Sequence, residues 1–205
     1  MSYVLIRSGE TDFDVEARVQ GTIDLPLTIQ GRTEVDAAAE ELRSVPVEVI
    51  YCCPGEPAFS TARVIGRALD LPVKPLRELD NMHFGLWQGM PIEEIRRKQP
   101  KVFRGWQEDP TSVCPPEGEM FADVHARVVE ALRKPLKKGV PFAVVAPEPL
   151  ATLVACVLKG EEPRLAGPLE RPIKLVEIIA APAEPEPASV ARGFGFSALR
   201  RFAYR

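Results

Sequence analysis

The chain has 205 residues, a formal net charge of −3 at pH 7 and a hydrophobic content of 45%. This length suits one α/β domain with a sizeable core, and the small negative charge supplies no basic field that would attract nucleic acid. Because no apolar run is long enough to span a membrane and the N-terminus lacks the features of a secretory signal, we expect a cytoplasmic protein without a membrane partner.

Strand and helix patterns alternate through the first half of the chain. The apolar run at 3–7 predicts a buried strand, and Thr28 is the expected N-cap of a helix that continues to about residue 44. The other elements predicted here are a polar loop over 8–27, strands over 47–51 and 71–75, and a helix over 57–69.

The second half continues the alternation. Phe121, Val124, Val128 and Leu132 fall at helical spacing and predict an amphipathic helix over 119–134. The other predicted elements are a loop over 79–90, short helices over 91–97 and 101–108, a strand over 142–146, a helix over 149–159 and a last strand over 174–180. This order predicts an α/β fold in which helices cover both faces of a mostly parallel sheet, as one domain over 1–180.

The character of the chain changes after residue 180. Residues 181–188, APAEPEPA, have the composition of a stiff, solvated linker. Residues 189–205 contain four arginines, several aromatic side chains and no acidic residue. Such a segment is typical of a docking peptide for a protein partner, and it could equally fold back over its own domain.

The cysteines give no sign of a metal or redox centre. Cys52, Cys53, Cys114 and Cys156 contain no C-x-x-C pair, and the chain has only two histidines. We therefore expect reduced, mostly buried thiols, no metal and no cofactor.

Five short motifs follow one another in a recognisable order. They are VLIRSGETDFD, RVQGTIDLPLTIQG, IYCCPGEPAFSTA, FGLWQG and VVAPEPL. In this order they resemble the histidine phosphatase superfamily, which includes phosphoglycerate mutase-like and acid-phosphatase-like enzymes, and the resemblance covers roughly residues 2–180. It implies a three-layer α/β/α sandwich. It also implies phosphoryl transfer through a phosphohistidine, with arginines and a second histidine around the phosphoryl group.

The opening motif departs from the family's Arg-His-Gly-Glu at the nucleophile. Arg7, Gly9 and Glu10 match, whereas Ser8 stands in place of the histidine, and a serine hydroxyl is a poor nucleophile without an adjacent base. The family's pocket asparagine falls on Asp14, whose carboxylate would repel a phosphate. Arg7 is therefore either a residual anion contact or, as we favour, a structural ion-pair partner of Asp14 or Glu10.

Further family positions are also replaced. The second phosphate-binding arginine falls on Pro57, the proton donor on Asn81 and the second histidine on Pro147, which Glu148 follows. None of these side chains supplies a positive charge or an acidic proton. The vestigial phosphate pocket is expected to comprise Arg7, Ser8, Glu10, Asp14, Gln20, Gly21, Pro57, Asn81, Pro147 and Glu148, with no catalytic and no metal-binding residue among them.

These replacements predict a catalytically inactive pseudophosphatase with a binding or regulatory role. One alternative is a residual or altered phosphatase, or a phosphoglycerate mutase-type phosphohydrolase, that uses Ser8, His83 or Glu78. The other is a sensor of a phosphorylated metabolite. We expect an unidentified protein partner and at most weak binding of an anion, and the sequence leaves a homodimer open.

Overall fold

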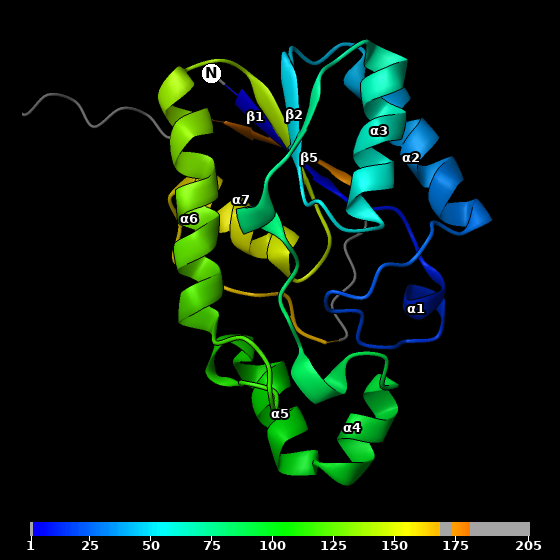
Figure 1. The fold of residues 1–205 in the computed structure, drawn as a ribbon, viewed down its shortest axis with the longest axis vertical. Coiled ribbons are helices and arrows are strands. Elements are labelled where there is room, and N and C mark those ends of the chain that lie inside the picture. Colours follow the sequence, from blue (N-terminus) through cyan, green and yellow to red (C-terminus); the bar gives the residue numbers. More distant parts are fainter. Residues whose placement is uncertain (1, 169–173, 181–205) are drawn as a thin grey trace, which may run out of the picture.

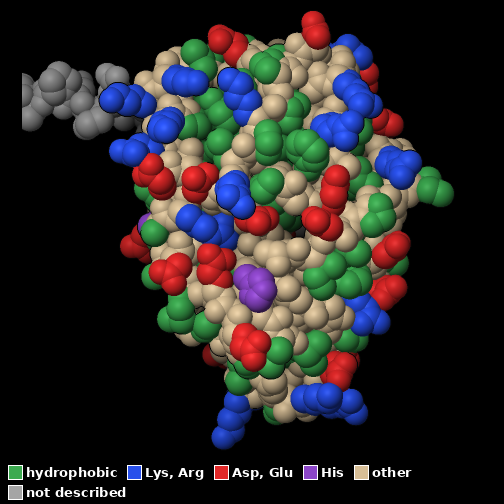
Figure 2. Space-filling model, in the orientation of Figure 1, with side chains coloured by type: hydrophobic (Ala, Val, Ile, Leu, Met, Phe, Trp, Pro, Cys, Tyr) green, Lys and Arg blue, Asp and Glu red, His purple; other side chains and the backbone are tan. Residues whose placement is uncertain are grey.

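The computed structural model describes residues 2–168 and 174–180. The linker expected at 181–188 and the basic–aromatic segment expected at 189–205 lie outside the described residues. In the space-filling view, basic and acidic side chains are interspersed over the visible face, in keeping with the small net charge (Figure 2).

A five-stranded sheet forms the centre of the described chain (Figure 1). Its order is β3-β2-β4-β1-β5, and the bounds are Ser2–Arg7 for β1, Val49–Cys52 for β2, Val73–Pro75 for β3, Phe142–Ala146 for β4 and Val176–Ala180 for β5. The β1–β4, β4–β2 and β2–β3 pairs are parallel, whereas β5 runs antiparallel to β1. The expected α/β fold with a mostly parallel sheet is confirmed.

Helices cover both faces of this sheet because each central strand is apolar on both sides. Tyr3 and Leu5 of β1 belong to one buried cluster and Val4 and Ile6 to the other, as the two-residue period of a strand requires. Helices α6 (Phe121–Lys138) and α7 (Leu150–Lys159) contribute to the first cluster, and α2 (Ile29–Leu42) and α3 (Ala58–Leu69) contribute to the second. Figure 1 shows the two helix pairs on opposite sides of the sheet.

A smaller helical region extends from one end of the sheet (Figure 1). It contains α4 (Ile92–Lys98), α5 (Pro100–Glu108) and the short 3₁₀ turns η2 (Gly85–Trp87) and η3 (Pro110–Ser112). The 3₁₀ turn η1 (Arg77–Leu79) lies against α6 instead. The rings of Trp87 and Trp106 lie with their centroids 5.0 Å apart, and both side chains are buried. This region therefore has its own aromatic packing, which joins the core beside α6.

Several elements differ from the sequence-based prediction. Strands β2 and β3 begin two residues later than expected, and the loop expected over 79–90 contains η2. The loop expected over 8–27 contains the short helix α1 (Asp12–Val15), which a capping box between Thr11 and Asp14 begins. Helix α6 continues past residue 134 to Lys138 because buried Pro135 is accommodated within it. The last strand begins at Val176 rather than at residue 174.

Among the helices of residues 2–168 and 174–180, none is long and apolar enough to cross a membrane.

Candidate functional site

The candidate site lies where β1 and β4 end side by side. Arg7 pairs in register with Ala146, and the backbone N–H of Ser8 donates to the carbonyl of Ala146 at 3.1 Å. Because parallel strands end at the same edge of a sheet, this register brings Ser8 next to Pro147. A cavity of about 400 Å³ opens at this point, within the size range of small-molecule sites.

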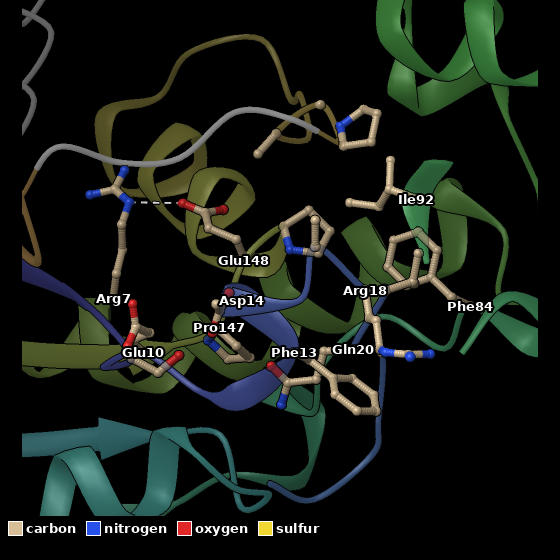
Figure 3. Close-up of a pocket in the computed structure, with 18 of the residues that line it drawn as sticks. Arg7, Glu10, Phe13, Asp14, Arg18, Gln20, Phe84, Ile92, Pro147 and Glu148 are labelled. Atoms are coloured by element: carbon tan, nitrogen blue, oxygen red, sulfur yellow. Dashed lines mark hydrogen bonds and ion pairs between the residues drawn. The ribbon is translucent and has the colours of Figure 1, made fainter. Parts of the chain in front are cut away.

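Most of the predicted pocket residues line this cavity (Figure 3). Those that do so are Arg7, Ser8, Glu10, Asp14, Gln20, Gly21, Pro147 and Glu148. Pro57 and Asn81 are buried outside the lining. The structure therefore brings together eight of the ten positions.

The guanidinium of Arg7 is held by two carboxylates. Its Nε donates to Oε1 of Glu148 at 2.8 Å, and both terminal nitrogens donate to Oε2 of Glu177 at 3.1 Å. The side chain of Arg7 is only 15% exposed. The expectation of a structural ion pair is confirmed, but the expected partners Asp14 and Glu10 are wrong, because β5 places Glu177 beside β1.

Asp14 and Glu10 instead hold the loop that follows β1. The Oδ2 of Asp14 accepts from the backbone N–H of Thr11 at 2.8 Å and from its hydroxyl at 2.7 Å. The Oε1 of Glu10 accepts from the hydroxyl of Thr28 at 2.7 Å, next to the start of α2. Both acids line the cavity, so their negative charges remain close to any bound ligand.

Asn81 and Gln20 fasten the walls of the cavity by amide hydrogen bonds. The Nδ2 of Asn81 donates to the carbonyl oxygens of Gly21 at 2.9 Å and Glu148 at 3.4 Å. The Nε2 of Gln20 donates to the carbonyl of Glu56 at 3.0 Å, just before Pro57 at the start of α3. Both amides join segments that are distant in sequence.

Titratable partners for Ser8 are scarce. Neither histidine of the chain lines the cavity, and exposed His83 accepts the backbone N–H of Gly85 through its Nδ1. No hydrogen bond to the Ser8 hydroxyl is present within residues 2–168 and 174–180. The carboxylates of Glu10, Asp14 and Glu148 line the same cavity, but each has other partners.

The adjacent cysteines do not take part in the site. Cys52 and Cys53 are buried, as expected, and lie outside the cavity lining. Burial raises the pKa of each thiol to about 12, so both stay protonated near neutrality. In the described part of the chain, His, Cys, Asp and Glu side chains form no group of three that could hold a metal ion.

Part of the cavity wall has no counterpart in the sequence-based prediction. The apolar and aromatic side chains of Phe13, Phe84, Ile92 and Trp106 line it together with Arg18 and Glu34. Phe13 and Arg18 could have been suspected because they lie between predicted pocket residues. Phe84, Ile92 and Trp106 come from the helical region below the sheet, and the sequence carries no signal that places them here.

Comparisons with known proteins give one consistent family. The sequence model described as "Histidine phosphatase superfamily (branch 1)" matches residues 3–166. "Phosphoserine phosphatase 1" of Hydrogenobacter thermophilus is 34% identical over 134 residues, which are 64% of this chain and 64% of that protein. "Glucosyl-3-phosphoglycerate phosphatase" of Mycobacterium tuberculosis is 36% identical over 124 residues, 60% of this chain and 55% of that protein.

A solved structure extends the similarity over most of the described fold. "Bacillus stearothermophilus YhfR" superposes with a TM-score of 0.75 at 28% identity and covers 87% of this chain and 90% of its own. The matched region spans less than two thirds of both curated relatives named above.

Proposed function

The chain belongs to branch 1 of the histidine phosphatase superfamily, and on this premise we propose that it is a member without phosphatase activity that acts by binding or regulation. The observation that carries the proposal is that Arg7 is already paired with carboxylates of the protein. Three of the five N–H groups of its guanidinium, one on each nitrogen, donate to Glu148 or Glu177. The one family arginine retained at this position is therefore already neutralised.

A phosphate ester entering the cavity would meet more negative than positive charge. At Arg7 it would have to share or displace two partly buried carboxylates that already neutralise the guanidinium, and a displaced carboxylate would be left without its cation. Glu10 and Asp14 also line the cavity and would repel a dianion. Both effects oppose the binding on which phosphoryl transfer depends.

The remaining chemistry of phosphoryl transfer lacks its groups as well. Ser8 has no imidazole beside it, because neither histidine lines the cavity. Pro147 stands where the family has its second histidine, and buried Asn81 stands where it has its proton donor. The side-chain amide of Asn81 donates hydrogen bonds to the backbone carbonyls of Gly21 and Glu148, which supports a structural role.

The test is a phosphatase assay with a matched active-site variant. Purified wild type and Ser8→Ala are incubated with p-nitrophenyl phosphate and with phosphoserine, and released phosphate is measured. We expect the same background rate from both proteins. Turnover by the wild type that Ser8→Ala abolishes would contradict the proposal.

A second candidate is a phosphatase with an altered nucleophile. The names of the relatives favour it, since both curated proteins reported above are called phosphatases. It requires Ser8 to be activated by a neighbouring carboxylate, such as that of Asp14 or Glu148, acting as general base. In the same assay this candidate predicts a rate that falls with Ser8→Ala.

A further inference from the structure

The cavity at the ends of β1 and β4 has two chemically different sides (Figure 3). Glu10, Asp14 and Glu148 lie on one side of the view, close to Pro147. Phe84 and Ile92 lie on the opposite side, where Arg18 is also found, and Trp106 belongs to the same lining. A ligand that fills the cavity would therefore contact carboxylates at one end and apolar side chains at the other.

The cations of the lining are already paired, whereas several of its acids are not. Arg7 is held by Glu148 and Glu177, and Arg18 is held by Glu16 and the carbonyl of Gly89. Within the described residues, Glu10, Asp14 and Glu34 contact no basic side chain and accept only neutral hydrogen bonds. The charge left for a ligand is negative.

We propose that this cavity binds an organic cation, a guanidinium or ammonium group carried on an apolar or aromatic body, in preference to a phosphate. This rests on the proposed function and names the ligand class of the same site. The cation lies against the carboxylates of Glu10, Asp14 and Glu34, and the apolar body lies against Phe84, Ile92 and Trp106. The aromatic and apolar wall favours the body of such a ligand through apolar contact.

Two sources can present this chemistry. One is a free small molecule, and the other is a peptide that carries arginine next to an aromatic residue. Residues 189–205 of this chain have that composition, with Arg192, Arg200, Arg201 and Arg205 among phenylalanines and a tyrosine. The proposal concerns the ligand chemistry that both sources share, and a variant without these four arginines distinguishes the two sources.

The first measurement compares three probes on the full-length chain by isothermal titration calorimetry. Phenethylguanidinium carries both the cation and the ring, phenethyl alcohol carries the ring alone, and inorganic phosphate carries the opposite charge. We expect binding of the guanidinium probe that is stronger than that of the alcohol and weakens as salt is added. Quenching or a shift of tryptophan fluorescence reports occupancy beside Trp106.

A matched pair of variants on α2 ties the binding to this cavity. Glu34→Gln removes a lining carboxylate, and Glu41→Gln removes an exposed one from the same helix outside the lining. We expect the affinity for phenethylguanidinium to fall roughly two- to fivefold in Glu34→Gln, the range of a partly exposed ion pair. Glu41→Gln should bind as the wild type does.

A variant of residues 189–205 distinguishes a separate ligand from the chain's own arginine-containing segment. In a full-length chain with Arg192, Arg200, Arg201 and Arg205 all changed to glutamine, tighter binding of the probe than in the wild type would identify the chain's own segment as a competitor. Equal binding would exclude the chain's own arginines as competitors and favour a separate molecule as the source. Either result supports the proposal.

Binding of phosphate in preference to the guanidinium probe, or no binding of that probe to either chain, would overturn it. The phosphatase assay decides separately on the proposed function. If the protein shows neither turnover nor cation binding, only the assignment of an organic cation as ligand is refuted. If the protein hydrolyses phosphate esters, the proposed function is refuted.

Discussion

Arg7 illustrates how far a single residue could be understood from the sequence. Its neighbourhood was expected to be acidic because Glu10 and Asp14 lie close to it along the chain. The structure confirms an ion pair but supplies its acids from residues 148 and 177. Glu177 lies opposite Leu5 in the antiparallel pairing of β5 with β1, and such a long-range register cannot be read from local patterns.

Glu177 should make stability depend on pH. Burial raises the pKa of Glu177, but hydrogen bonds from Lys159 and Arg7 outweigh this and hold it below its ordinary value. The folded state therefore binds fewer protons here than the unfolded state, and the resulting stability is present above about pH 4.3, the unfolded pKa of a glutamate. It is lost as the pH falls through the lowered pKa of the folded state.

The expected outcome is a difference between wild type and Glu177→Gln that shrinks in acid. At pH 7 the variant should have a free energy of unfolding lower by about 1 kcal/mol, since these ion pairs are partly exposed. Urea denaturation at pH 7, 5, 4 and 3 measures the difference. A gap that stays constant over this range would show that the carboxylate of Glu177 does not stabilise the fold through its charge.

At the scale of elements, the strands and long helices were predictable because their periodicities are strong. The apolar run of 142–146 indicates a strand because it is short, rich in valine and bounded by Pro141 and Pro147, and the spacing from Phe121 to Leu132 indicates a helix. Helix α1 was missed because it is a single turn that depends on the hydrogen bonds between Thr11 and Asp14 rather than on apolar spacing. The direction of β5 depends on its partner, so composition does not reveal it.

Two glycines, one at the end of a helix and one inside a helix, give predictions of opposite sign for the free energy of unfolding. Gly139 ends α6 at φ +66°, with no atom within 4 Å of a Cβ placed there, whereas Gly105 lies inside α5 with only ordinary contact to Val113. Gly139→Ala should therefore lower the free energy of unfolding by about 1 kcal/mol through backbone strain alone. Gly105→Ala should raise it by up to about 1 kcal/mol through helix propensity.

Chemical denaturation of the two alanine variants beside the wild type measures both effects. Because the substitution is the same, differences in side-chain hydrophobicity largely cancel. Equal signs for the two variants would mean that the left-handed conformation of Gly139 does not determine its cost.

At the scale of the whole molecule, the reactivity of the four thiols measures how often the core becomes exposed by unfolding. Cys52, Cys53 and Cys156 are buried, and Cys114 is exposed. Ellman's reagent should therefore modify one thiol rapidly in the native protein and the other three only at the rate of unfolding, because burial also keeps Cys52 and Cys53 protonated.

The variant Cys114→Ser provides the control. It should lose the rapid phase and keep the slow one. Two or more rapid thiols in the wild type would indicate that the buried layer of Cys52 and Cys53, or helix α7 with Cys156, opens far more readily than its burial implies.

One side of the candidate site could be predicted from the sequence, and the other could not. Its charged and polar side follows strand ends and motif positions, so eight lining residues could be named from the sequence. Its apolar side is built by Phe84, Ile92 and Trp106, which approach only because α4 and α5 fold back below the sheet. No local pattern encodes that approach, since it depends on packing between distant segments.

The position of β1 has a consequence for synthesis on the ribosome. Strand β1 is made before both of its hydrogen-bonding neighbours, β4 and β5, which come from residues after 141. A nascent chain of its first 140 residues has two unpaired edges on β1, which attract other strands, and an Arg7 that has not yet met Glu148 or Glu177. The sheet is thus completed, and the charge at its end neutralised, only when the last third of the chain arrives.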